Sequence, residues 1–369
     1  MQHPAHCVFS DARGAEAARR GIVDGTGRWV GAGAGRIGGG HGSVVGAAGE
    51  DARRHMAIVR TLLGDVPASS IGITYYHEHI VAQPPRFFDL WEPDLVLDDV
   101  DAIAREVADF QGIGGSCIVD GTAVDYGRNI PATVEVARRT GCYIVGTAGY
   151  NKAPYFAPEI EQASLEQLQA WVERDCRDGI DGTPHRAGAL KLGTSYYHMT
   201  PSEERAARAV CRVQRATGLP LYTHTEAGTF ALEQLNLLAE EGVELEHVCI
   251  GHLDRNPDGW YLRQIAKRGV FIGFDQISKI KYFPDQVRVE RIIELVEAGY
   301  GRRILLSGDM ARRSYLRAYG GGPGYRYIAG TFVPRVVAQL CEAGHPPSEA
   351  EQVGEDLLIN NPRAFLSIE

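Results

Sequence analysis

From residue 56 onward the chain alternates short apolar runs with longer amphipathic segments. The short runs are rich in β-branched and aromatic residues, as buried strands are; they are 71–76, 116–120, 143–147, 188–192, 221–223, 248–250, 270–274 and 304–307. Each run precedes a segment with apolar residues at helical spacing; these segments are 99–111, 131–139, 164–177, 201–217, 229–241, 259–268, 286–298 and 334–343. Strand–helix pairs repeated in this way predict an α/β fold, the (β/α)8 TIM barrel.

Composition excludes several classes of protein. The net charge is −9, so the chain lacks the basic surface of a dedicated nucleic-acid binder. No apolar run approaches the roughly 20 residues that a membrane-spanning helix needs. The seven cysteines are scattered and form no CxxC pair, which fits a reducing compartment and argues against a disulfide scaffold. We therefore expect a cytoplasmic protein with neither a nucleic-acid nor a membrane partner.

Residues 1–55 differ in amino-acid composition from the rest of the chain. They hold 13 of the 44 glycines, no lysine and few large apolar residues. A segment with so little apolar surface cannot offset the entropy lost on ordering. We expect a disordered N-terminal extension over 1–55 and one barrel domain over 56–369. The Gly-rich stretch 33–38 matches GxGxxG, but the residues before it are a poor strand and those after it a poor helix, whereas a dinucleotide site requires both elements.

Polar residues with metal-binding chemistry stand where the predicted strands end. Active sites of TIM barrels lie at the carboxyl ends of the strands. His77 and His79 follow the first run, and on an extended chain their side chains point the same way, so both can reach one metal ion. His224 and His252 follow neighbouring strands, the fifth and sixth, and can reach a second ion. Asp309, after the eighth strand, can act as a further ligand and then accept a proton.

Lys191 stands at the end of the fourth predicted strand. Only five lysines occur in the chain, so each is a candidate for a role that needs its amine. A protonated amine repels a metal ion, but a lysine carbamylated by CO2 becomes an anionic oxygen ligand able to bridge two cations. Carbamylation requires the neutral amine, which burial favours by lowering the lysine pKa. The apolar residues 187–190 before Lys191 predict such burial.

This set of residues resembles the ligand set of the phosphotriesterase family of the amidohydrolase superfamily, and the resemblance covers about residues 56–369. It implies a binuclear site in which a carboxylated Lys191 and a hydroxide bridge two divalent ions, zinc first, with manganese and cobalt as alternatives. It also implies that His77, His79 and Asp309 hold the buried ion, and His224 and His252 the more exposed one. Tyr75-Tyr76, where relatives often have Leu-Thr, is a departure that affects the pocket floor and removes no ligand.

Within that family the chain most resembles the lactonases of phosphorylated sugars. The stretches that carry this likeness are 191–196, 223–229, 251–256, 280–282 and 307–315. The resemblance implies that Lys281, Arg312 and Tyr315 bind a substrate phosphate. Loops after strands seven and eight of a TIM barrel are its usual phosphate site, which supports the same assignment. Lys279 is a rival for the role of Lys281, and a solvated basic surface is the alternative interpretation of these residues.

We therefore expect a metal-dependent hydrolase that opens the lactone ring of a phosphorylated sugar by attack of a metal-bridging hydroxide. Asp309 is expected to carry the proton to the leaving alkoxide. Tyr150, after the third strand, resembles a family tyrosine near the site, and we expect it either to donate to the substrate oxygen or only to line the pocket. Two alternatives remain open: a phosphotriesterase or acyl-homoserine or general lactonase with the same two metal ions, and a non-catalytic sugar-phosphate-binding protein. The resemblance further suggests a homodimer.

Overall fold

The computed structural model describes residues 57–87 and 91–369. The predicted extension over residues 1–55 lies outside the described residues. The barrel strands follow one another in chain order; they are β3 (Ile73–Glu78), β4 (Gly115–Asp120), β5 (Tyr143–Val145), β6 (Thr147–Gly149), β7 (Ala189–Thr194), β8 (Leu221–Thr225), β9 (Val248–Ile250), β10 (Phe271–Phe274) and β11 (Ile304–Leu306). Neighbouring strands pair in parallel, in the two ladders β3-β4-β5 and β6-β7-β8-β9-β10-β11.

The two ladders join into one cylinder. β5 and β6 are two halves of one strand on either side of Gly146, whose carbonyl oxygen accepts from the backbone N–H of Gly188 at 2.9 Å. At the other junction, Ser307 Oγ donates to the His77 carbonyl at 2.6 Å, and the Asp309 N–H donates to the same oxygen at 3.1 Å. The predicted TIM barrel is confirmed, with its last seam closed by these loop contacts beside β3 and β11.

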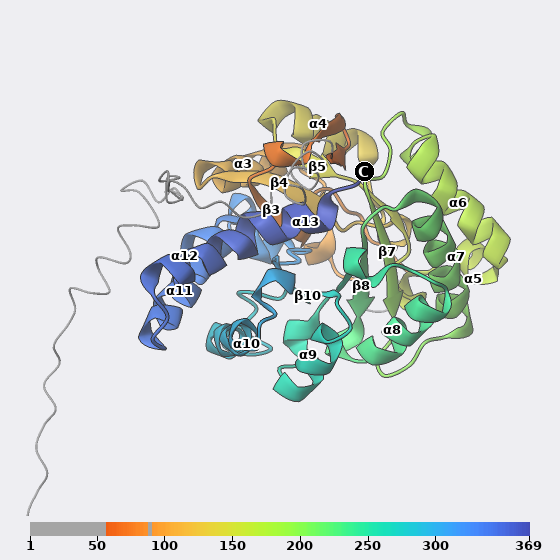
Figure 1. Cartoon of the computed structure of the whole chain (residues 1–369). Helices are drawn as coiled ribbons and strands as arrows, with labels where there is room; N and C mark the ends of the chain where they lie inside the picture. The colour runs from red at the N-terminus through yellow and green to blue at the C-terminus, as the bar shows by residue number, and fades with distance from the viewer. Residues whose placement is uncertain (1–56, 88–90) are drawn as a thin grey trace, which may run out of the picture.

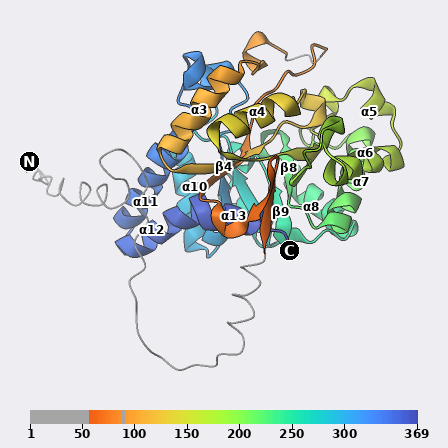
Figure 2. The ribbon, with the colours of Figure 1, turned by 90° about the horizontal axis from the view of Figure 1, so that it is seen from above.

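Helices surround the strands, as the two views show (Figures 1 and 2). They are α3 (Val100–Gly112), α4 (Ile130–Thr140), α5 (Pro158–Gln162), α6 (Leu165–Arg177), α7 (Pro201–Thr217), α8 (Ala231–Glu240), α9 (Gly259–Ala266), α10 (Asp285–Glu297), α11 (Val333–Glu342), α12 (Pro347–Glu355) and α13 (Asn361–Leu366). α7 begins with a capping box, in which Thr200 accepts from the Glu203 N–H and Glu203 from the Thr200 N–H. Within residues 57–87 and 91–369, no helix is both long and apolar enough to cross a membrane.

The apolar residues form two cores. The larger core lies between the strands and the surrounding helices. The smaller one includes residues from several barrel strands, among them Tyr76, Val119 and Tyr222. A short antiparallel hairpin, β1 (Ile58–Thr61) with β2 (Gly64–Pro67), contributes Val59 to the smaller core. The barrel is therefore packed inside, and its polar side chains gather where the strands end.

Candidate metal centre

The structure brings the predicted metal ligands together at the carboxyl ends of the strands. His77 lies in β3, Lys191 in β7 and His224 in β8, whereas His79, His252 and Asp309 follow β3, β9 and β11. The first strand extends two residues further than predicted, so His77 is held by the sheet. His252 and Asp309 adopt left-handed backbone conformations, with φ of 58° and 44°. Such conformations are costly for these residue types and concentrate at functional sites.

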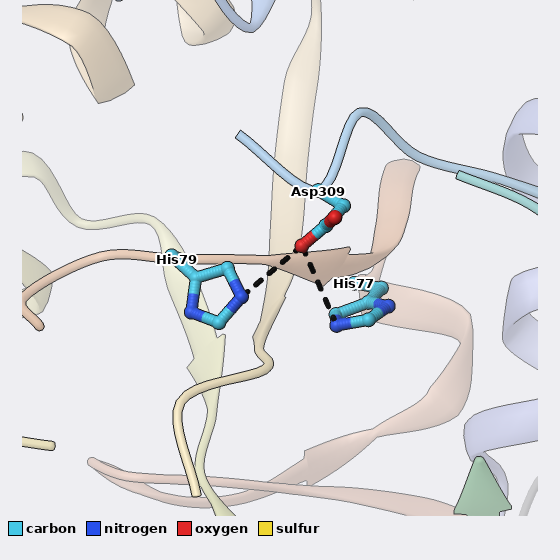
Figure 3. Close-up of side chains that lie close together, drawn as sticks. All are labelled: His77, His79 and Asp309. Atoms are coloured by element: carbon cyan, nitrogen blue, oxygen red, sulfur yellow. Dashed lines mark ion pairs between the residues drawn. The ribbon is translucent and has the colours of Figure 1, made fainter. Parts of the chain in front are cut away.

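His77, His79 and Asp309 form the first potential ion site (Figure 3). Asp309 Oδ1 lies 3.2 Å from His79 Nε2 and 3.8 Å from His77 Nε2. Both histidines are buried, and the Asp309 side chain is 18% exposed, so the site is open on the side of Asp309. Two imidazole nitrogens and one carboxylate oxygen converging on one point are a suitable ligand set for a divalent transition metal.

His224 and His252 form the second pair. His252 Nε2 lies 2.8 Å from His224 Nδ1, and the two rings are edge to face with centroids 4.5 Å apart. Burial and the neighbouring His252 hold the pKa of His224 well below 6.5, which keeps its imidazole neutral. A neutral imidazole is the form that ligates a metal ion.

Asp275 links the two pairs of histidines, and the sequence analysis missed it. Its Oδ2 accepts from His77 Nδ1 at 3.0 Å, and its Oδ1 accepts from His252 Nδ1 at 2.6 Å. Tyr76 also donates to Oδ2 at 2.5 Å, and a Cβ atom on Gly273 would lie 2.0 Å from the Tyr76 hydroxyl, so a glycine is required there. Asp275 is fully buried directly after β10.

The other two histidines are held in the same way. Thr122 Oγ1 donates to Asp120 at 2.6 Å and so accepts from His79 Nδ1 at 2.9 Å. His224 Nε2 donates to Glu226 Oε2 at 3.2 Å. Each of the four histidines thus has one ring nitrogen beside a protein acceptor and the other facing the centre. With the proton on the outer nitrogen, the inner nitrogen of each ring can ligate a metal ion, which is the arrangement that a metal site requires.

Lys191 projects into the same centre from β7. Its Nζ donates to the Gly121 carbonyl at 2.8 Å and lies 3.3 Å from His77 Nε2. Burial lowers the pKa of Lys191, an effect that the nearby Asp309 opposes. Burial and the Lys191 ammonium lower the pKa of His77 to about 3, so His77 is neutral near pH 7. These contacts place the amine beside His77 of the first site.

Two side chains hydrogen-bond to the Asp309 carboxylate oxygen that faces away from His77 and His79. Its Oδ2 accepts from Gln276 Nε2 at 2.7 Å and from Lys279 Nζ at 3.0 Å, while Lys279 also donates to the Asp309 carbonyl at 2.7 Å. Burial favours the protonated acid, but Lys279 and His79 outweigh it and hold the pKa of Asp309 well below 3.8. The structure therefore pairs Lys279 with Asp309. Lys279 Nζ also lies 5.2 Å from the centroid of the Tyr315 ring, so its rivalry with Lys281 for the phosphate stays a prediction.

The three predicted phosphate contacts are only partly together. Lys281 Nζ lies 5.4 Å from the centroid of the Tyr315 ring and 5.1 Å from that of Tyr282. Arg312 instead forms ion pairs with Glu92 and with Asp94, the latter at 3.6 Å. Lys281 and Tyr315 thus lie side by side, whereas Arg312 is paired with two carboxylates.

Tyr150 does not point into the centre. Its hydroxyl donates to the Leu168 carbonyl of α6 at 3.1 Å, and its ring lines a cavity of about 380 Å³ beside Trp171. The predicted donation from Tyr150 to the substrate oxygen does not agree with this geometry, because Tyr150 follows β6 with its side chain directed at the outer helices. Tyr126, which the sequence analysis also missed, has its ring 5.0 Å from that of His79.

Comparisons with known proteins show the family to which the chain is similar. The sequence profile of the phosphotriesterase family matches residues 57–366. The phosphotriesterase homology protein of Escherichia coli K12 is 33% identical over 295 residues, which are 80% of this chain and 97% of that protein. A phospho-furanose lactonase of Mycoplasmopsis agalactiae is 31% identical, over 84% of this chain and 92% of the relative. The crystal structure of the lactonase Lmo2620 from Listeria monocytogenes superposes with a TM-score of 0.81 at 40% identity, covering 85% of this chain and 99% of that one.

Proposed function

The chain belongs to the phosphotriesterase family of metal-dependent hydrolases acting on ester bonds, and we propose that it opens the lactone ring of a phosphorylated sugar. The observation that carries the proposal is the position of Lys281 and Tyr315, which lie together after β10 and β11. The Tyr315 ring centroid also lies 5.2 Å from Nζ of Lys279, the partner of Asp309. A lactone carbonyl at the histidines would place a phosphate on the same molecule at Lys281. The two relatives named as lactonases support this substrate class.

Two divalent cations fit the centre, zinc first and manganese or cobalt next. His77, His79 and Asp309 would hold one cation, His224 and His252 the other, and a carboxylated Lys191 would bridge them. When bound, the cations supply Lewis-acid activation of water and of the substrate carbonyl. Asp275, Thr122 and Glu226 would accept the proton on the outer nitrogen of each imidazole when its inner nitrogen binds a cation.

The side chains around the centre perform the remaining steps. Water adds to the carbonyl carbon, the ring C–O bond breaks, and Asp309 takes the proton from water and gives it to the leaving alkoxide oxygen. Gln276 and Lys279 fix the Asp309 carboxylate by hydrogen bonds of 2.7 and 3.0 Å, so it is oriented before the substrate arrives. Lys281 supplies a point charge for the phosphate and thereby lowers the entropic part of the barrier.

Arg312 is paired with Glu92 and Asp94, which leaves less positive charge for a phosphate. The alternative to be tested is therefore a lactonase or phosphotriesterase that does not recognise a phosphate. Zinc-loaded protein would be assayed by proton release on an aldonolactone 5-phosphate, the same lactone without phosphate, an acyl-homoserine lactone and an aryl phosphotriester. We expect the phosphorylated lactone to be preferred, with a preference that falls on Lys281→Met. Equal turnover of the unphosphorylated lactone would contradict the proposal. Failure to hydrolyse any of the four would favour a non-catalytic binding protein.

A further inference from the structure

Three charged residues outside the proposed metal ligands meet beside the centre. Lys152 follows β6, Glu226 follows β8 and Arg255 follows β9, so their loops open at the same end of the barrel as the metal centre. Lys152 and Arg255 each pair with Glu226; Arg255 Nη1 lies 3.1 Å from Glu226 Oε1, and Lys152 Nζ contacts Oε2. We name Lys152, Glu226 and Arg255 the rim cluster.

The rim cluster lies one imidazole ring away from the proposed exposed metal. Glu226 Oε2 accepts from His224 Nε2 at 3.2 Å, and the opposite nitrogen of that ring, Nδ1, faces His252. On its other side the cluster reaches the phosphate residues, because the Arg255 guanidinium lies 4.4 Å from the centroid of the Tyr282 ring and Lys281 lies 5.1 Å from the same centroid. The cluster therefore lies between the metal centre and the side that we assign to the phosphate.

The cluster has unused donors. In the part of the chain that the structure describes, the Lys152 ammonium and the Arg255 guanidinium hydrogen-bond to Glu226, and they also lie over the rings of Tyr155 and Tyr282. An ammonium carries three donors and a guanidinium five. The side chains of Lys152, Glu226 and Arg255 are 11%, 23% and 21% exposed, so they are largely desolvated yet open on one side. Removing three charges from water is costly, and additional hydrogen bonds to a ligand would offset that cost.

We propose that the rim cluster binds the ring hydroxyl groups of the substrate, an inference that rests on the proposed function. Lys152 and Arg255 donate to hydroxyl oxygens, and Glu226 accepts from a hydroxyl proton. This mixture of strong donors and one carboxylate matches vicinal hydroxyls, which both donate and accept. A phosphorylated polyol lactone is then held at the carbonyl, the ring hydroxyls and the phosphate, and the cluster selects among ring stereoisomers.

The test compares two unreactive ligands of the zinc-loaded protein by titration calorimetry. One ligand is 1,4-anhydropentitol 5-phosphate in its best-bound diastereomer, and the other is tetrahydrofurfuryl phosphate, the same ring without ring hydroxyls. We expect the hydroxylated ligand to bind at least about tenfold more tightly, because the rim donors are left unpaired by the other ligand. Lys152→Met and Arg255→Met should each reduce that ratio to about threefold or less. Lys267→Met, at an exposed lysine beyond α9, is the matched control and should keep the ratio.

Zinc content is measured on every variant. If Lys152 acts only through Glu226 on His224, Lys152→Met would lower zinc content and weaken both ligands equally, which would overturn the proposal. A ratio near one in the unaltered protein would also overturn it, as would a ratio that survives in both variants. A protein that prefers the hydroxylated ligand but opens no phosphorylated lactone would keep the hydroxyl subsite and remove the proposed function.

Discussion

Lys279 places its ammonium nitrogen 3.0 Å from Oδ2 of Asp309, on the side of the carboxylate away from the histidines. Asp309 Oδ1 faces His77 and His79, so the two oxygens of one carboxylate have different partners. One oxygen can remain a ligand while the other is held by Lys279 and Gln276. This division fits a residue that both binds a cation and moves a proton.

Asp309→Asn is expected to keep much of the metal and lose turnover. The amide retains one oxygen for a cation but cannot accept a proton, and general acid–base catalysis is worth about a hundredfold to ten-thousandfold. We predict a fall in kcat of about a thousandfold with at least one zinc retained per chain. Rates and metal content would be measured on the same preparation. Near-normal rates in the variant would show that Asp309 is not the proton carrier.

Metal binding by the protein is expected to require CO2, which would carbamylate Lys191. Burial lowers its pKa and so favours the neutral amine that reacts with CO2. Metal-free protein reconstituted with zinc in CO2-depleted buffer should bind less metal than the same protein with bicarbonate added. The carbamate carbon should appear in a 13C spectrum after labelling with 13C-bicarbonate. Full zinc binding by Lys191→Ala would contradict a bridging role.

Asp275→Ala is expected to weaken both proposed metal sites, because Asp275 accepts from a histidine of each pair. Loss of a partner that orients a ligand typically lowers metal affinity by about 10–100-fold. Competition with a zinc chelator would measure the affinity of each ion. Asp356→Asn, a buried acid on the far helices, is the control. A loss confined to one ion would show that Asp275 supports only one pair.

Asp125 is expected to make the metal-free protein less stable as the pH rises. Burial raises the pKa of Asp125 from 3.8 to about 7, although both of its oxygens accept from the Asn151 N–H. The folded state therefore binds a proton more tightly than the unfolded state, and this stabilisation is full below pH 3.8 and lost as the pH passes 7. Relative to the unaltered protein, Asp125→Asn should gain at least about 2 °C in Tm between pH 5 and pH 8. An unchanged difference in Tm would contradict the shifted pKa.

The fold and the proposed metal ligands could be predicted from the sequence because both follow from the order of strands and helices along the chain. Strand runs and helices alternate along the chain, and parallel strands bring all their carboxyl ends to one side. The alternation predicts nothing beyond residue 343, where the structure forms α12 and α13. Each of these helices has proline in its first turn, where proline is well tolerated but resembles a break in the pattern.

Residues that act through another side chain were not accessible in this way. Asp275 directly follows β10, just as several proposed ligands follow their strands. That position could have marked Asp275 as a candidate site residue. Its two histidine partners, however, lie on other strands and become visible only in three dimensions. The prediction for Tyr150 does not agree with the structure for a related reason. Its backbone N–H donates to the Lys191 carbonyl beside the centre, but its side chain turns toward α6. Sequence position fixes the strand end and leaves the direction of the side chain open.

The most direct test of the proposed function is the rate of ring opening of one aldonolactone with and without its 5-phosphate, on zinc-loaded and on metal-free protein. We predict that the loaded protein prefers the phosphorylated lactone at least about a hundredfold in kcat/KM, because Lys281 is proposed to make a charge-assisted contact to the phosphate. We also predict that activity disappears with the metal and returns on adding zinc. Equal rates on the two lactones, or activity that survives metal removal, would contradict the account.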